Sequence, residues 1–160
     1  MGAIGEGVKK TAIEGVLIQE LAQIDTAGGP VLHMLRSDGP LFRGFGEIYF
    51  SEVLPGAVKA WKRHRLQTQH FAAPAGLIEV VIYDDREHSP SRGVVESHLL
   101  GRPDHYRLLR IPPLLWYGFT ARGAAPGLLA NCADIPHSPD ESERLPADSP
   151  LIPYAWAGEK

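Results

Sequence analysis

The chain has 160 residues, of which 44% are hydrophobic and 22% charged, a length and composition that favour one globular domain and exclude a wholly disordered protein. The formal net charge is only −3, and the basic residues are scattered apart from one cluster between residues 59 and 65, which excludes a general nucleic-acid surface. No apolar run approaches the roughly 20 residues of a membrane-spanning helix.

The N-terminal part, residues 1–29, is predicted to hold a tail and a first strand. Residues 13–21 combine a helix-like spacing of apolar residues with β-branched content. The turn-forming cluster at 25–30 and the apolar run at 31–35 favour the order strand, turn, strand.

From residue 45 onward, short apolar segments closed by Pro, Gly, Asp or Ser predict strands. They cover residues 45–52, 57–61, 68–72, 77–83, 94–99, 106–111, 118–121 and 127–132. The run from Val80 to Tyr83 is apolar throughout, which predicts a strand buried on both faces. Pro112 and Pro113 end the strand before them, because proline supplies no amide hydrogen to a sheet. This succession of strands, without a long amphipathic helix, predicts an all-β sandwich or jelly roll.

The C-terminal segment is dense in Pro, Ser and acidic residues from 133 to 153, which predicts an irregular surface arm. Tyr154 and Trp156 are expected to anchor its end. We therefore expect a single domain over 1–160, with its core over 30–132 and the arm over 133–160. Cys132, the only cysteine, cannot form an internal disulfide, and the first residues lack the features of a signal peptide, so we expect a cytoplasmic protein.

Five blocks of sequence occur in an order and at a spacing that are found together in one known family. They are Phe45–Ser51, Pro55–Trp61, Tyr83–Arg86 followed by Ser89, Pro90 and Gly93, Ile111–Pro113 followed by Tyr117–Phe119, and Ile152–Trp156. With these blocks the chain resembles dTDP-4-dehydrorhamnose 3,5-epimerase and its relatives over about residues 30 to 156. The resemblance implies a cupin jelly roll (a double-stranded β-helix), usually a homodimer, that binds a dTDP-linked 4-keto-6-deoxyhexose in the mouth of the barrel.

The proton-transfer residues of that family are missing from their usual positions. The resemblance implies a histidine held by an aspartate as base, and a tyrosine as acid on the other face of the sugar. This chain has Lys62 at the position of the histidine, no tyrosine shortly after Asn131 and Cys132, and Tyr117–Phe119 where the family has His-Gly-Phe. The counterpart of the aspartate is Asp148.

Lys62 can act as a base only if its pKa falls far below the usual value of about 10.4. Burial or the positive charges of Lys59, Arg63 and His64 would lower that pKa, whereas a neighbouring Asp148 would raise it. An ion pair between Lys62 and Asp148 and a catalytic dyad of the same two residues therefore stay open as alternatives.

Strand alternation conflicts with the resemblance around these cations. On a regular strand Lys59 and Arg63 share one face, and Lys62 and His64 share the other. The resemblance puts Lys59 and Lys62 both at the ligand, which requires a β-bulge near Ala60–Trp61. Contact of this cluster with a phosphate or pyrophosphate and a solvated charged edge stay open as alternatives.

A metal-binding cupin would use the positions of Lys62, His64, Gln67 and Tyr117 as ligands. Only His64 and Gln67 are suitable ligands, so we expect neither a metal nor another cofactor.

The leading hypothesis is a sugar-nucleotide epimerase or isomerase that acts on a dTDP-4-keto-6-deoxyhexose by proton transfer beside the ketone. Candidate catalytic residues are Lys62, His64, Tyr117 and Asp148, and candidate substrate-binding residues are Lys59, Arg63, Gln67 and Asn131. Two alternatives stay open because fold alone does not determine function. One is an altered or inactive cupin that only binds a small molecule, and the other is a cupin recruited to a cyclisation or isomerisation in natural-product biosynthesis.

Overall fold

The structure is a computed structural model that describes residues 7–157 as an almost entirely β protein. Residues 1–6, where the sequence predicts no signal peptide, and residues 158–160 lie outside the described residues. The strands are β1 (Val8–Lys10), β2 (Leu17–Glu20), β3 (Gln23–Ile24), β4 (Val31–Leu32), β5 (Glu47–Val53), β6 (Val58–His64), β7 (Gln69–Ala75), β8 (Leu77–Tyr83), β9 (Val95–Gly101), β10 (Arg107–Ile111), β11 (Trp116–Arg122), β12 (Gly127–Ala133) and β13 (Ser142–Arg144). A 3₁₀ helix, η1 (Pro139–Glu141), precedes β13. Within the described range, no helix is long and apolar enough to cross a membrane.

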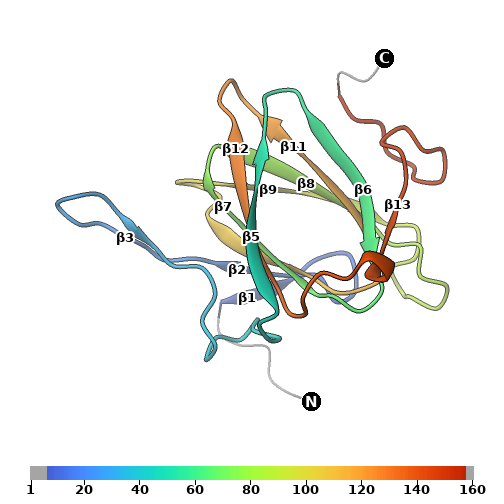
Figure 1. Cartoon of the computed structure of the whole chain (residues 1–160), viewed down its shortest axis with the longest axis horizontal. Coiled ribbons are helices and arrows are strands. Elements are labelled where there is room, and N and C mark those ends of the chain that lie inside the picture. Colours follow the sequence, from blue (N-terminus) through green and yellow to red (C-terminus); the bar gives the residue numbers. More distant parts are fainter. Residues whose placement is uncertain (1–6, 158–160) are drawn as a thin grey trace.

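Two antiparallel sheets enclose the interior of the molecule (Figure 1). The six-stranded sheet has the order β1-β2-β10-β7-β12-β5, and the five-stranded sheet has the order β13-β6-β11-β8-β9. Strands β3 and β4 form a separate hairpin that projects from one side of the molecule (Figure 1). The prediction of an all-β fold is confirmed.

The eight strands predicted from residue 45 onward correspond to β5 through β12, with ends that differ by a few residues. The prediction for 13–21 is wrong in its first half, because a hydrogen bond from the Val16 amide to the Ile13 carbonyl (3.2 Å) closes a turn before β2 begins at Leu17. The predicted arm is not irregular throughout, because it contains η1 and β13. Strand β13 forms where the backbone of the arm pairs with β6.

The apolar run in β8 contributes to two hydrophobic clusters. Val80 and Ile82 belong to the large core, which contains side chains of both sheets, whereas Val81 packs with Trp61 and Trp156. The side chains of Val80, Val81 and Ile82 are all fully buried. Because successive side chains of a strand point to opposite faces, this confirms a strand buried on both faces.

The C-terminal arm, residues 134–157, lies against β6 and is held there by backbone and aromatic contacts. The Trp61 amide donates to the Leu145 carbonyl (2.9 Å), and the Leu145 amide donates back to the Trp61 carbonyl (3.1 Å). Trp156 is only 3% exposed, and its ring centre lies 5.1 Å from that of Trp61, with Tyr154 packed beside both. The prediction that these aromatics anchor the end of the chain is confirmed.

Replacing this anchor should destabilise the whole protein. We expect Trp156→Ala to lower the free energy of unfolding by about 3–5 kcal/mol, because it removes a large buried aromatic side chain and leaves a cavity. Denaturant unfolding followed by far-UV circular dichroism measures the change. Leu151→Ala, at a side chain that is 69% exposed on the same arm, is the control and should change stability by less than about 0.5 kcal/mol. A Trp156→Ala protein as stable as this control would contradict the anchoring role.

Candidate active site

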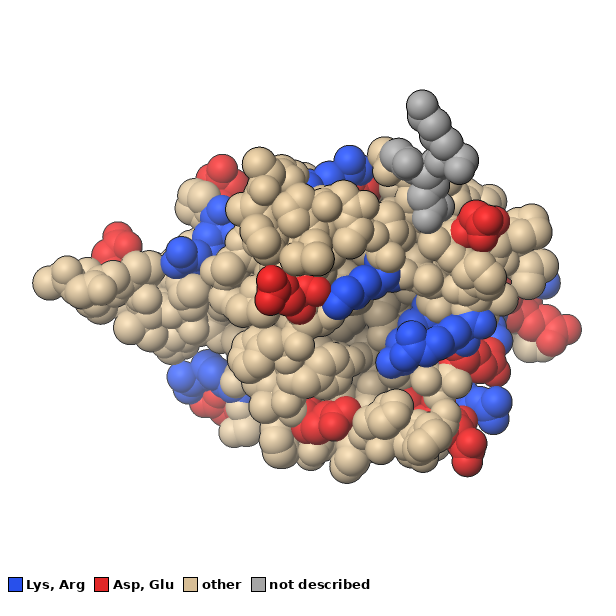
Figure 2. Space-filling model, turned by 45° about the horizontal axis from the view of Figure 1, so that its top comes forward, with Lys and Arg blue, Asp and Glu red and all other residues tan. Residues whose placement is uncertain are grey.

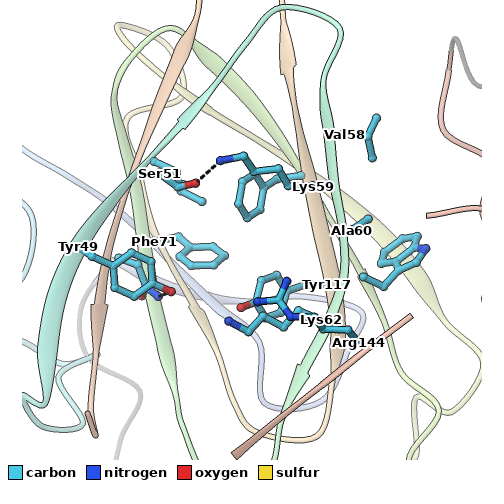
Figure 3. A pocket seen from close by; sticks show the side chains of 13 residues that line it. Tyr49, Ser51, Val58, Lys59, Ala60, Lys62, Phe71, Tyr117 and Arg144 are labelled. Atoms are coloured by element: carbon cyan, nitrogen blue, oxygen red, sulfur yellow. Dashed lines mark hydrogen bonds between the residues drawn. The ribbon is translucent and has the colours of Figure 1, made fainter. Parts of the chain in front are cut away.

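A cavity of about 370 Å³ opens between the two sheets (Figure 3). Its walls come from β5, β7 and β12 of one sheet, from β6 and β11 of the other, and from β13: Tyr49, Ser51, Val58, Lys59, Ala60, Trp61, Lys62, Phe71, Tyr117, Phe119, Leu129, Asn131 and Arg144. The space-filling view shows Lys and Arg side chains beside a hollow in the molecular surface (Figure 2). The volume is in the range of small-molecule sites, and the lining combines apolar walls with a few polar groups, as such sites do.

An extra residue in β6 brings Lys59 and Lys62 to the same side of the strand. In the register with β11, Tyr117 pairs with Lys62 and Phe119 pairs with Lys59, so β6 advances three residues where β11 advances two. Such a bulge shifts the alternation of side chains by one position. The predicted irregularity near Ala60–Trp61 is confirmed, and both lysines line the cavity.

The cavity carries positive charge that is available to a ligand. Within residues 7–157, neither Lys62 nor Arg144 has a side-chain hydrogen bond or an ion pair. Lys59 donates to Ser51 Oγ (2.8 Å) and to the Glu52 carbonyl (2.7 Å). Burial, and next the Arg144 guanidinium, lower the pKa of Lys62. An anionic or carbonyl oxygen entering the cavity therefore meets cations that lack an internal partner.

From Tyr117 in the cavity wall, a buried hydrogen-bonded chain leads to His64 and Glu141 behind the wall. The Tyr117 hydroxyl lies 2.8 Å from His64 Nε2, and His64 Nδ1 lies 2.6 Å from Glu141 Oε2. The other oxygen, Glu141 Oε1, accepts the backbone amides of Leu66 (2.9 Å) and Gln67 (2.8 Å). Although burial raises the pKa of Glu141, the hydrogen bonds from His64 and from both amides lower it overall. Burial lowers the pKa of His64 and raises that of Tyr117 well above its usual value, so the chain rests as carboxylate, neutral imidazole and phenol.

Tyr49 on β5 brings a second hydroxyl to the cavity from the opposite sheet (Figure 3). Asn131 Nδ2 donates to its oxygen (2.9 Å), while Asn131 Oδ1 accepts the His70 amide (3.2 Å), which determines the orientation of the Asn131 amide group. The Tyr49 oxygen thus acts as an acceptor toward Asn131. Its own hydrogen remains available for a ligand.

The structure brings four of the eight candidate residues to the cavity wall: Lys59, Lys62, Tyr117 and Asn131. His64 and Gln67 are buried behind the wall, where Gln67 Nε2 donates to the Ile135 carbonyl (2.8 Å) and Gln67 Oε1 accepts from Gln69. Among the described residues, no group of three or more His, Cys, Asp and Glu side chains is placed to hold a metal ion.

Arg63 and Asp148 lie elsewhere, contrary to expectation. Arg63 points to the other face of β6, where it pairs with Asp85 (3.1 Å) and Glu143 and lies over the Trp116 ring (4.5 Å). Asp148 is exposed and forms no ion pair with Lys62 within the described chain, so neither the predicted ion pair nor the dyad is found.

The bulge explains why Asp148 does not reach Lys62. It turns Trp61, and not Lys62, toward the part of the arm that contains Asp148, and Trp61 Nε1 donates to the Ala147 carbonyl (3.1 Å). The carboxylate that does enter the site is Glu141, seven residues earlier in the arm.

Three site residues were not singled out from the sequence: Tyr49, Glu141 and Arg144. The alternation in β5 puts Tyr49 on the same face as Ser51, so a signal for Tyr49 was available. Glu141 and Arg144 belong to the arm, and no local pattern specifies where the arm crosses β6.

Comparisons with known proteins agree with this architecture, although no model of a known protein family matches the chain. The probable low-salt glycan biosynthesis epimerase Agl13 of Haloferax volcanii is 38% identical over 152 residues, which cover 92% of this chain and 96% of that protein. The spore coat polysaccharide biosynthesis protein SpsL of Bacillus subtilis is 30% identical over 149 residues, which cover 92% and 98%.

Solved structures show the same fold. A dTDP sugar isomerase of Desulfovibrio desulfuricans G20 is 62% identical, with a TM-score of 0.90, over 93% of this chain and 95% of that one. A dTDP-4-dehydrorhamnose 3,5-epimerase of Bacillus anthracis, solved with TDP and PPi bound, has a TM-score of 0.83 at 17% identity, over 96% and 91%, and shows the fold alone. The predicted cupin jelly roll is confirmed. The chain belongs to the dTDP-4-dehydrorhamnose 3,5-epimerase-like family of cupin sugar epimerases and isomerases.

Proposed function

We propose that this protein is a sugar-nucleotide epimerase or isomerase that acts on a dTDP-linked 4-keto-6-deoxyhexose by proton transfer beside the ketone. The observation that carries the proposal is the pair of hydroxyl groups on opposite walls of the cavity, Tyr117 from one sheet and Tyr49 from the other. Epimerisation beside a ketone removes a proton from one face of the ring and returns one to the other. It therefore needs a proton-carrying group on each face.

Lys62 has the position and charge to stabilise the intermediate. Removing the proton leaves an enolate, whose negative charge is on the former ketone oxygen. Lys62 is the direct neighbour of Tyr117 across the β6–β11 register and lacks an internal partner within residues 7–157. A cation already in place where charge develops lowers the barrier without reorganisation.

The nucleotide part of the substrate is supported by the relatives and by the charge of the cavity. The Desulfovibrio desulfuricans protein is a dTDP sugar isomerase, and the Bacillus anthracis epimerase was solved with TDP and PPi bound. In this chain Lys59 and Arg144 line the same cavity as Lys62. We assign the pyrophosphate to Lys59 and Arg144, because charged hydrogen bonds to phosphate are about twice as strong as neutral ones.

Proton exchange tests the reaction directly. When the protein is incubated with a dTDP-4-keto-6-deoxyhexose in heavy water, we expect deuterium to appear at a ring carbon beside the ketone, because the abstracted proton exchanges with solvent before it returns. Mass spectrometry and proton NMR of the sugar measure the incorporation. Absence of exchange throughout the pH range in which the protein is folded would overturn the epimerase proposal. If dTDP binds but no exchange occurs, the result would favour the alternative of an inactive cupin that only binds a small molecule.

Nucleotide binding tests the assignment of the pyrophosphate. We expect dTDP at 100 times its dissociation constant to stabilise the protein by about 2.7 kcal/mol. Arg144→Gln should weaken dTDP binding about tenfold, because it removes one charged contact worth about 1.5 kcal/mol. Isothermal titration calorimetry measures both proteins, with Arg65→Gln, an exposed arginine outside the cavity, as the control. Equal affinity of the Arg144 and Arg65 variants would remove Arg144 from the binding site.

We also propose that two copies of the chain associate, in the cytoplasm. Strand β5 is an edge of its sheet, and its outward side chains Ile48 and Phe50 are 52% and 60% exposed, with Phe45 (66%) next to them. An exposed apolar strand at a sheet edge favours pairing with another chain. The lone cysteine, Cys132, is buried as a thiol, so the fold does not depend on an oxidising compartment.

A charge on this edge should separate the two copies. We expect the wild type to have the mass of two chains, and Phe50→Lys the mass of one, because a lysine would have to be desolvated in the interface. Light scattering coupled to size-exclusion chromatography measures the mass, with Leu151→Lys on the arm as a control that stays dimeric. A monomeric wild type, or a dimeric Phe50→Lys protein, would contradict this interface.

A further inference from the structure

We infer that Tyr117 is the group that takes the proton from the substrate, and that Glu141 enables this by holding His64 in the tautomer whose Nε2 accepts the Tyr117 hydrogen. The inference rests on the proposed function and deepens it. Tyr117 takes the proton from the carbon beside the ketone, and Lys62 stabilises the negative charge of the enolate. His64 and Glu141 are positioning residues, because both are buried behind Tyr117 and neither lines the cavity.

The hydrogen bonds of Glu141 determine the tautomer of His64. Glu141 Oε1 accepts two backbone amides, from Leu66 (2.9 Å) and Gln67 (2.8 Å), and Oε2 faces His64 Nδ1 at 2.6 Å. An ionised carboxylate only accepts hydrogen bonds, so the hydrogen of this contact belongs to Nδ1. A neutral imidazole carries one hydrogen, which leaves Nε2 as an acceptor.

The tautomer in turn orients the Tyr117 hydroxyl. With a bare Nε2, the 2.8 Å contact between His64 and Tyr117 is a hydrogen bond that the hydroxyl donates. Within residues 7–157, the Tyr117 oxygen has no other hydrogen-bond partner, and Tyr117 lines the cavity. Its remaining lone pairs are therefore available to a substrate, while its hydrogen already faces a base. This is the arrangement of a hydroxyl activated by an imidazole that a carboxylate orients.

The resulting step balances in atoms and charge. The C–H bond beside the ketone breaks, its electron pair forms the enolate, and the hydrogen bonds to the Tyr117 oxygen as the former Tyr117 hydrogen moves to His64 Nε2. The imidazolium that forms lies 2.6 Å from the Glu141 carboxylate, and Lys62, the neighbour of Tyr117 in the β6–β11 register, supplies the positive charge that stabilises the enolate. No phenolate accumulates, which matters because burial raises the pKa of Tyr117 well above its usual value.

Among the described residues, Lys62 lacks a chain of hydrogen bonds through which a proton could pass, such as the relay from Tyr117 through His64 to Glu141. Within the described chain it has no hydrogen-bonded group to which a proton could pass, whereas Tyr117 connects through His64 to Glu141. An unpaired ammonium at the cavity wall therefore acts as a fixed positive charge. This difference between Lys62 and Tyr117 can be tested by substitution.

Glu141→Gln provides a test that does not depend on activity. The glutamine oxygen can still accept the Leu66 and Gln67 amides, but its nitrogen then faces His64 Nδ1 and can only donate. His64 must move its hydrogen to Nε2, which donates to the Tyr117 oxygen. In ¹⁵N NMR of histidine-labelled protein, we expect the protonated and bare nitrogen signals of His64 to exchange places between wild type and variant, with the signals of buried His70 unchanged as an internal control.

A wild-type His64 with its hydrogen on Nε2, or a folded Glu141→Gln protein with an unchanged tautomer, would overturn the inference. If Glu141→Gln does not fold, Tyr117→Phe tests the same contact. It should shift the Nε2 signal, because that nitrogen loses its donor, and leave the hydrogen on Nδ1. A spectrum unaltered by Tyr117→Phe would likewise overturn the inference.

Deuterium exchange then separates the roles of Tyr117 and Lys62. We expect Tyr117→Phe to slow exchange at least about 100-fold, as loss of a general base does. Lys62→Arg should stay within about tenfold of wild type, because arginine keeps the charge and does not deprotonate in proteins. Tyr106→Phe, at a buried tyrosine outside the cavity, is the matched control and should exchange like wild type.

The opposite pattern, with exchange retained in Tyr117→Phe and lost in Lys62→Arg, would make Lys62 the base and overturn the inference. Exchange at the wild-type rate in Tyr117→Phe would also overturn it. A wild-type protein that shows no exchange would overturn the proposed function. The NMR measurement would still show, independently of activity, whether His64 carries its hydrogen on Nδ1.

Discussion

The extra residue in β6 is the constraint on which the site depends. It directs Lys59, Lys62 and His64 to the interior and turns Trp61 to the opposite face. Regular alternation would put Lys59 and Lys62 on opposite faces, and only one of them could reach the cavity. β11 accommodates the bulge with Gly118, where a Cβ would lie 2.5 Å from the Ala60 Cβ. Close approach of the two strands therefore requires glycine at this position.

The same bulge connects the packing of the arm to the chemistry of the site. Trp61, turned outward, packs with Trp156 and binds the arm through its backbone and ring nitrogen. The arm held in this way delivers Glu141 to His64 and Arg144 to the cavity. Interactions that stabilise the C-terminal arm thus also position a carboxylate and a cation of the site, and loss of the arm would remove both.

The structure shows which residues occupy the site where the histidine and tyrosine of the family pattern are missing. Lys62 stands at the position where the resemblance places a histidine, but an imidazole is still present one layer deeper, as His64, and is still paired with a carboxylate. Tyr117 lies between this pair and the cavity. On the other wall, where the expected tyrosine of the last strand is absent, Asn131 hydrogen-bonds the hydroxyl of Tyr49 from the neighbouring strand. Both changes keep a hydroxyl group at the cavity wall while altering which residue supplies it.

The strands from residue 45 onward, the burial of β8 on both faces and the aromatic anchor at the C-terminus could be predicted from the amino-acid sequence, whereas the bulge near Ala60–Trp61 is predicted only from the conflict between strand alternation and the family resemblance. The strands and their burial follow from local rules of alternation, turn formation and proline geometry, which act within one strand and its flanks. Which side chains meet depends on contacts between segments that are far apart in the sequence. His64 and Glu141 are 77 residues apart, and Tyr49 and Asn131 are 82 apart. The family resemblance indicates Asp148, whereas the structure brings Glu141 to His64, because backbone pairing and aromatic packing between distant segments set the place where the arm crosses β6.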